Sequence, residues 1–259
     1  MDLLTRTYNR VLHLTLNRPD KRNALTASMC AEILEQVNAA QTNPDVGSIL
    51  ICSSGSVFCA GMDLEETSPG GPETQQLHEQ IFTMGVRSLK PIVIGVQGAA
   101  LGGGLGLVAQ ADVVMASDKA VFGLPEIRIG FWPFLVYRAV EAAIGNRRTA
   151  QAALTGHLFH PEEALQWGLV HKICPAVELG DRIKVMAKEL AKASPAAIAA
   201  GLEYVKRSRS LNYEEAGKIA AELRTRVTSG ADFKEGVAAF KERREPRWPS
   251  LPPSFYAKD

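Results

Sequence analysis

The chain has 259 residues, of which 46% are hydrophobic, and its formal net charge is +1. A chain of this length and apolar content can bury one large core, or a core with an appendage. The balance of 29 basic and 28 acidic residues argues against a general nucleic-acid surface, which needs an excess of lysine and arginine.

Cysteine and histidine give no metal-binding pattern. The four cysteines include no C-x-x-C pair, and the five histidines are scattered. We therefore expect no structural metal, reduced thiols and a cytoplasmic location. We also expect no leader peptide, no peroxisomal ending and no membrane span, because no apolar run reaches the ~18 residues that a span needs.

Strands and helices alternate through the first half of the chain. The expected strands are Val11–Leu16, Ser48–Cys52, Ile92–Val96 and Asp112–Ala116. The expected helices run from about Thr26 to Asn43, from Gln75 to Ser88 and from Leu105 to Ala111. A proline- and glycine-rich loop, Glu65 to Glu73, separates the first two helices. This alternation predicts an α/β fold.

The second half of the chain is predominantly helical in pattern. From Pro161 onward, only Leu169–Cys174 reads as a strand. The pair Asp232 and Glu235 has the spacing of a capping box, which predicts the start of the last helix. We expect a core over residues 1–194 and a C-terminal helical region over residues 195–259.

Three consecutive glycines, Gly102 to Gly104, lie between an expected strand and an expected helix. Glycine lets another molecule approach the backbone, and free N–H groups at a helix start favour negative charge. The turn can therefore bind an anion, or it can be a tight turn without a ligand. A dinucleotide site needs a third glycine at position 107, where the chain has Leu107.

Four segments in order carry a resemblance to a known family. They are Asn17–Leu25, Phe58–Leu64, the triple-glycine turn and Phe122–Gly130. Together they resemble the crotonase superfamily, the enoyl-CoA hydratase/isomerase group of fatty acid metabolism. The resemblance implies a spiral of ββα units with a C-terminal helical region that packs at a trimer interface. It also implies an acyl-CoA substrate, with coenzyme A entering as part of that substrate and no other cofactor, and a homotrimer or a hexamer built as a dimer of trimers.

The resemblance also implies an oxyanion hole made of two backbone N–H groups, those of Met62 and Gly103. Fixed donors stabilise the negative charge that develops on a thioester oxygen, and one such donor is typically worth ~10²–10³ in rate. The residues beside the two donors are implied to contact the substrate. They are Ala60, Gly61, Asp63, Leu64, Gly102 and Gly104. Cys59 lies in the same motif and is expected to be a small packed residue rather than a nucleophile.

Glu126 is the expected proton-transfer residue. It matches the Gly-x-Pro-Glu motif of the family, and Pro125 fixes the turn before it. The apolar residues that follow it, Ile127, Ile129 and Phe131 among them, predict a raised carboxyl pKa that suits acid–base catalysis. The alternative is a surface glutamate paired with Arg128.

Position 106 departs from the family pattern. Hydratases of the family usually carry a second glutamate there, and this chain has Gly106. We therefore expect double-bond isomerisation, 3-enoyl-CoA to 2-enoyl-CoA, by a single glutamate. Hydration with a substitute acid such as Glu65 or Glu66, and non-catalytic acyl-CoA binding, stay open as alternatives. A nicotinamide oxidoreductase is a further alternative of another class.

The substrate's coenzyme A is expected to contact Asn23, Ala24 and Leu25, by resemblance to the family. The same three residues can instead simply lead into the helix at Thr26. Two basic residues, Lys21 and Arg22, are candidates for the coenzyme A phosphates, and Phe240–Lys241 resembles a family region that reaches toward coenzyme A. The acyl pocket is expected to take its shape from Trp132, Phe134, Tyr137 and the loop at Ser68 to Pro72.

Overall fold

The computed structural model describes residues 1–66 and 71–258, and it confirms the α/β class. Six strands form the main sheet in the order β1-β2-β3-β4-β6-β9. Their bounds are Leu3–Tyr8, Val11–Leu16, Ser48–Ser53, Ile92–Val96, Val113–Ser117 and Lys172–Cys174. The first pair is antiparallel and the other four pairs are parallel.

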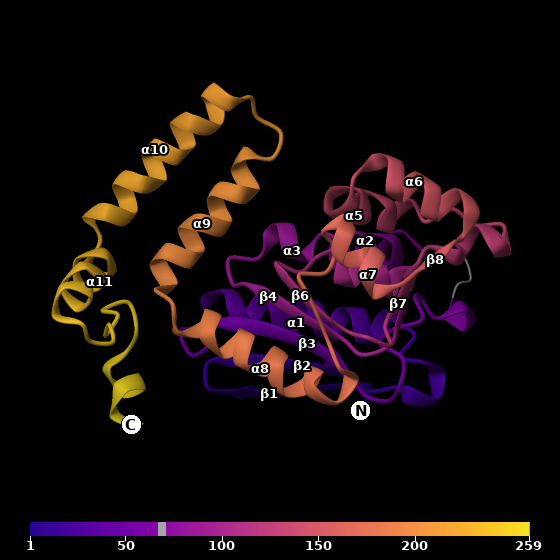
Figure 1. Cartoon of the computed structure of the whole chain (residues 1–259), viewed down its shortest axis with the longest axis horizontal. Coiled ribbons are helices and arrows are strands. Elements are labelled where there is room, and N and C mark those ends of the chain that lie inside the picture. The colour runs from indigo at the N-terminus through magenta and orange to yellow at the C-terminus, as the bar shows by residue number, and fades with distance from the viewer. Residues whose placement is uncertain (67–70, 259) are drawn as a thin grey trace.

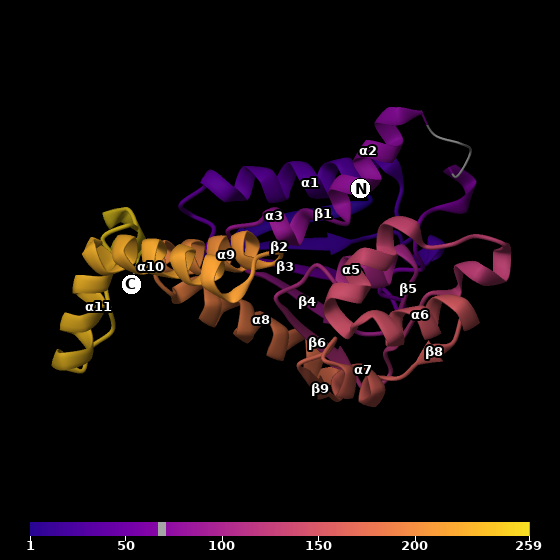
Figure 2. The same cartoon turned by 90° about the horizontal axis from the view of Figure 1, so that it is seen from above.

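Helices cover both faces of the main sheet, as Figure 2 shows. Helix α1 (Ala27–Thr42) lies on one face and α8 (Ala176–Lys192) on the other. Alternate strand residues therefore face different layers: Ile49 and Ile51 pack in the core with α1, whereas Leu50 packs in the core with α8. This arrangement explains why the central strands are apolar runs rather than alternating ones.

The predicted start of α1 is confirmed in detail. The Thr26 side chain accepts a hydrogen bond from the Met29 N–H at 3.1 Å, as an N-cap residue does. The expected helix from Gln75 to Ser88 is instead two helices, α2 (Pro72–Ile81) and α3 (Met84–Arg87). The break places Phe82 between them, and that position matters for the site below.

Three very short strands form a second sheet in the order β5-β7-β8. Their bounds are Ala99–Leu101, Val121–Gly123 and Leu158–Phe159. Between β5 and β6 lies α4 (Gly103–Val108), which begins inside the triple-glycine turn. The sequence did not predict these strands, because two or three residues are too few for an alternating pattern.

The remaining helices follow in chain order. Helices α5, α6 and α7 span Phe134–Ile144, Asn146–Thr155 and Pro161–Trp167. Short 3₁₀ helices span Pro19–Lys21, Leu64–Glu66, Pro125–Ile129 and Pro253–Lys258. In Figure 1, α5 to α7 lie at one end of the main sheet, on the side of the small sheet.

The C-terminal helices extend away from the body of the molecule at the other end (Figure 1). They are α9 (Pro195–Ser208), α10 (Tyr213–Ser229) and α11 (Ala231–Glu242). Helix α9 begins at Pro195, the residue near which the helical region was expected to start. No helix in the described ranges is long and apolar enough to cross a membrane.

The capping box predicted for the last helix is wrong, although the helix begins where expected. Helix α11 has Gly230 at its N-cap and no side-chain cap. Asp232 is buried and instead accepts hydrogen bonds from the hydroxyls of Ser194 and Ser250, at 2.6 and 2.7 Å. Glu235 forms an ion pair with Arg244. Tertiary contacts therefore use both side chains that the local pattern assigned to the cap.

Candidate active site

Two loops that are distant in the sequence meet at the N-terminus of α4. Cys59 pairs with β5, the strand that leads into α4, through two backbone hydrogen bonds. Its N–H donates to the Ala99 carbonyl at 3.0 Å, and its carbonyl accepts the Leu101 N–H at 2.9 Å. A Cβ atom placed on Gly103 would lie 3.3 Å from the Met62 nitrogen. The amides of Met62 and Gly103 are therefore neighbours, and neither donates to an acceptor within the described part of the chain.

The close approach of the two loops depends on glycine. Gly102 has a φ of +51°, which L side chains rarely adopt, and a Cβ there would lie 2.8 Å from Oε1 of Glu126. A Cβ on Gly104 would lie 2.3 Å from the Cys59 carbonyl oxygen, which is too close for any real contact. These two positions explain the run of glycines by local packing. Gly103 is the first residue of α4, so its N–H has no acceptor within the helix.

The N-terminal segment holds the Met62 loop in place. Leu25 donates its N–H to the Gly61 carbonyl at 2.8 Å and accepts the Asp63 N–H at 2.9 Å. Arg18 donates to the Asp63 carboxylate at 2.9 Å and to the Ala24 carbonyl at 2.8 Å. The pKa of Asp63 is lowered, chiefly by this hydrogen bond from Arg18. The sequence did not single out Arg18, since its partner lies 45 residues away.

Asn23 is fully buried, and its side chain is engaged within the protein. Its oxygen accepts the Arg18 N–H at 2.8 Å, and its amide donates to the carbonyls of Ser54 and Val57, each at 2.8 Å. These bonds fix the loop that precedes α1. The side chains of Asn23 and Leu25 are buried, so a ligand at this segment would contact its backbone or the half-buried Ala24 side chain.

The other expected binding residues differ in exposure. Ala60 is half-buried, and its N–H donates to the Arg22 carbonyl at 3.0 Å, whereas Leu64 is exposed. Lys21 forms an ion pair with Glu65 at 3.1 Å on the surface. Phe240 is 86% exposed on α11. The expected loop residues Ser68 to Gly70 lie outside the described ranges, and so do any contacts of the Glu66 side chain.

Glu126 lies against the glycine turn, with its carboxylate over Gly102. The residue is half-buried, and its Oε2 atom is buried without a hydrogen-bond partner among the described residues. Burial raises the pKa of this carboxyl, and a backbone hydrogen bond lowers it in part. The alternative ion pair with Arg128 is not found in the described ranges, where Arg128 donates to the Gly156 carbonyl at 2.8 Å.

The source of this burial differs from the prediction. Ile127, Ile129 and Phe131 are exposed rather than packed around the carboxylate. Trp132 stacks on Tyr137 with ring centroids 5.7 Å apart, and Phe134 is exposed. The Glu126 carboxylate is therefore covered by the turn at Gly102 rather than by the apolar residues that follow it in the sequence.

Position 106 faces an aromatic side chain. A Cβ atom on Gly106 would lie 2.8 Å from the ring of Phe82 and 3.1 Å from Val136. A side chain at this position would therefore collide with Phe82 unless the ring moved. The sequence did not identify Phe82, because its position depends on the break between α2 and α3.

Cys59 is a buried packing residue, as expected. Burial raises the pKa of its thiol to about 12, and this pKa keeps it protonated near neutral pH. No group of His, Cys, Asp or Glu side chains in the described ranges could hold a metal ion.

The comparisons with known proteins cover nearly the whole chain. A sequence model of the family described as enoyl-CoA hydratase/isomerase matches residues 6–250. The chain is 36% identical to a probable mitochondrial enoyl-CoA hydratase of Dictyostelium discoideum over 250 residues, 94% of this chain and 89% of that protein. It is 32% identical to a trans-2-decenoyl-[acyl-carrier-protein] isomerase of Streptococcus mutans, over 95% of this chain and 97% of that protein. A crystal structure of an enoyl-CoA hydratase from Mycobacterium smegmatis superposes with a TM-score of 0.90, at 28% identity, covering 96% of this chain and 99% of that one.

Proposed function

The chain belongs to the enoyl-CoA hydratase/isomerase family, and on this premise we propose that it moves a double bond in an acyl-CoA thioester. The substrate is a 3-enoyl-CoA and the product is the conjugated 2-enoyl-CoA. The proposal rests on two observations. The half-buried carboxylate of Glu126 has an Oε2 atom without a hydrogen-bond partner among the described residues, and position 106 is a glycine that faces Phe82.

The neighbouring N–H groups of Met62 and Gly103 would bind the thioester oxygen. When a proton leaves C2, the electron pair of that C–H bond delocalises toward this oxygen and forms an enolate. Two preorganised donors stabilise the charge as it develops, without the reorganisation that water would need. The free amides at the start of α4 support this role.

Glu126 would carry the proton. Its ionised carboxylate takes the proton from C2, and the resulting carboxylic acid returns it to C4 as the double bond moves into conjugation. Electrons and protons balance, and the glutamate ends ionised. A pKa raised by burial makes the carboxylate a stronger base than an exposed glutamate.

Hydration of a 2-enoyl-CoA is the alternative reaction. It requires an activated water and a second acid or base near C3, and Gly106 supplies no carboxylate there. Glu65 would have to serve instead, and its carboxylate is exposed and paired with Lys21. The relative named as an isomerase shows that isomerisation occurs in proteins similar to this one.

Coenzyme A would lie along the segment Lys21 to Leu25, whose backbone already pairs with the Met62 loop. The assembly we propose is a homotrimer, or a hexamer built as a dimer of trimers, with α9 to α11 at the interface. Large apolar side chains exposed on or beside these helices support it: Val205, Leu211, Phe233, Val237 and Phe240. The mass of the intact protein in solution tests this assembly.

The experiment compares Glu126→Gln with Glu65→Gln. We expect Glu126→Gln to lower the rate of 3-enoyl-CoA isomerisation by about 10²–10⁴-fold, the usual contribution of a positioned acid–base group. Binding of a saturated acyl-CoA should persist, because the backbone donors are unchanged. Glu65→Gln should keep at least half of the activity. The proposal fails if Glu126→Gln stays within a few-fold of the unmodified protein, or if Glu65→Gln is the variant that loses turnover.

A further inference from the structure

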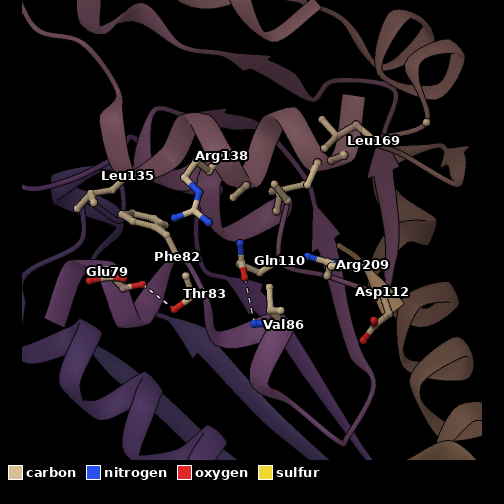
Figure 3. A pocket seen from close by; sticks show the side chains of 18 of the residues that line it. Glu79, Phe82, Thr83, Val86, Gln110, Asp112, Leu135, Arg138, Leu169 and Arg209 are labelled. Atoms are coloured by element: carbon tan, nitrogen blue, oxygen red, sulfur yellow. Dashed lines mark hydrogen bonds between the residues drawn. The ribbon is translucent and has the colours of Figure 1, made fainter. Parts of the chain in front are cut away.

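A cavity of about 440 Å³ lies among α2, α3, α4 and α5 (Figure 3). The residues that the argument uses are Phe82, Gln110, Leu135 and Arg138. The site residues Met62, Gly103 and Glu126 do not line it. The cavity is therefore a separate space beside the proposed thioester site.

Phe82 is the residue that the two spaces share. Its ring lines the cavity, and its Cζ atom would lie 3.2 Å from a Cβ on Gly103. The same ring would lie 2.8 Å from a Cβ on Gly106, and the residue is almost fully buried. Phe82 therefore stands between the N-terminal end of α4, where the thioester would bind, and the cavity.

The cavity lies farther along α4 than the proposed thioester site. Gln110 follows Gly103 by seven residues along α4 and the turn after it, a rise of about 10 Å at 1.5 Å per residue. An acyl chain that starts at the Gly103 N–H and follows α4 would therefore pass the Phe82 ring before it reached the cavity.

The cavity wall beyond Phe82 carries hydrogen-bond donors. Gln110 is only 7% exposed, its oxygen accepts the Gly85 N–H at 3.0 Å, and its amide nitrogen has no acceptor in the described part of the chain. Figure 3 shows this nitrogen pointing toward the guanidinium of Arg138, which forms no ion pair with any described residue. Unpaired donors disfavour an alkyl tail, whereas a carboxylate would satisfy them.

Other charged groups at this cavity have partners or lie apart from the donor pair. Asp112 accepts the Ile92 N–H at 2.8 Å and lies beside Arg209 (Figure 3). Glu79 lies on α2, on the far side of Phe82 from Gln110 (Figure 3). Within the described ranges, neither the Gln110 amide nitrogen nor the Arg138 guanidinium has an acceptor.

We propose that Phe82 sets the upper length of the acyl group by closing the thioester site off from this cavity. With the ring in place, only short acyl groups fit. With the ring removed, longer groups enter, and those that end in a carboxylate are preferred. The inference rests on the proposed function, because it takes the thioester to lie at Met62 and Gly103.

The experiment measures dissociation constants by calorimetry for butyryl-CoA, octanoyl-CoA and the carboxylate-ended suberyl-CoA. These compounds bind without reacting, so the result does not depend on turnover. The variants are Phe82→Ala, the more conservative Phe82→Leu, and Leu135→Ala, which removes apolar volume from the same cavity without changing the ring of Phe82. The double variant Phe82→Ala with Arg138→Met tests the donors.

We expect the unmodified protein to bind butyryl-CoA at least tenfold more tightly than octanoyl-CoA. In Phe82→Ala or Phe82→Leu, this difference should shrink by at least tenfold, and suberyl-CoA should bind more tightly than octanoyl-CoA until Arg138 is also replaced. Leu135→Ala should keep the original length preference. The proposal is overturned if the unmodified protein binds both chain lengths equally, or if neither Phe82 variant changes the preference more than Leu135→Ala does. A clear length preference without any isomerisation would instead refute the proposed reaction and leave the role of Phe82 standing.

Discussion

Asp63 shows how one ion pair holds the Met62 loop. Arg18 contacts two carboxylates, that of Asp63, whose side chain is 9% exposed, and that of Asp2, whose side chain is 51% exposed. Breaking a buried pair leaves a charge without compensation, whereas an exposed pair contributes little because water screens it. The two aspartates therefore offer a matched comparison around a single arginine.

We predict that Asp63→Asn lowers the free energy of unfolding by about 2 kcal/mol at pH 7, the usual contribution of a hydrogen bond to a charged group. Asp2→Asn should change it by less than about 0.5 kcal/mol. Because the folded-state pKa of Asp63 is lowered, its contribution is present above the ordinary pKa of 3.8 and is lost as pH falls through the folded value. Urea unfolding at pH 7 and in acid measures both effects. Equal losses for the two variants would contradict this account.

The contribution of Glu126 to stability has the opposite dependence on pH from that of Asp63. Its pKa is raised in the folded protein, so its ionisation opposes folding, and the protein loses stability as pH rises from the ordinary value of 4.5 through the folded value. Glu126→Gln removes this ionisation. We expect the variant to be more stable than the unmodified protein by about 1 kcal/mol at pH 7, the low end of the cost of an unsatisfied buried polar group. The difference should disappear near pH 4. A variant that is less stable at pH 7 would show that the carboxylate has a partner that stabilises it.

At the scale of elements, the site depends on how closely α4 approaches the backbone at Cys59. The contact at Gly104 leaves no room for a methyl group, since a Cβ would meet the Cys59 carbonyl oxygen at 2.3 Å. Gly201 on α9 is also a helical glycine, yet a Cβ there would meet nothing within 4 Å. The same substitution at the two positions separates close packing from helix propensity.

We predict that Gly104→Ala lowers the free energy of unfolding by about 3 kcal/mol, because the methyl group forces α4 away from its neighbour. It should also reduce acyl-CoA binding, since the Gly103 N–H moves with the helix. Gly201→Ala should raise the free energy of unfolding by about 0.5–1 kcal/mol. Denaturant melts and calorimetry measure these changes. If Gly104→Ala were as stable and as active as the unmodified protein, the tight turn would not position the donors.

At the scale of the whole molecule, periodicity predicted the main sheet and its covering helices well. Strands β2 and β4 have the predicted bounds, and Thr26 caps α1 as its residue type suggests. The motifs also identified the two loops that meet at α4. These features follow from local patterns in the sequence.

Features that arise from contacts between distant segments were not predictable. The break at Phe82 interrupts a continuous helical pattern, and only the fold places its ring opposite Gly106. The role of Arg18 depends on its hydrogen bond to Asp63. The Asp232 carboxylate accepts hydrogen bonds from two distant serines instead of capping α11. Sequence spacing predicts contacts between residues that are close along the chain, whereas these side chains contact residues that are close only in the folded protein.

The central claim is that a single carboxylate moves a double bond, with no second acid at position 106. The most direct test offers 3-enoyl-CoA and 2-enoyl-CoA separately, with short acyl groups, and follows the absorbance of the conjugated thioester. We predict that the absorbance rises with 3-enoyl-CoA, and that 2-enoyl-CoA loses signal only as far as the isomerisation equilibrium, without forming a 3-hydroxyacyl product. Efficient loss of the 2-enoyl signal with formation of the hydroxyacyl thioester would contradict the account and identify the protein as a hydratase.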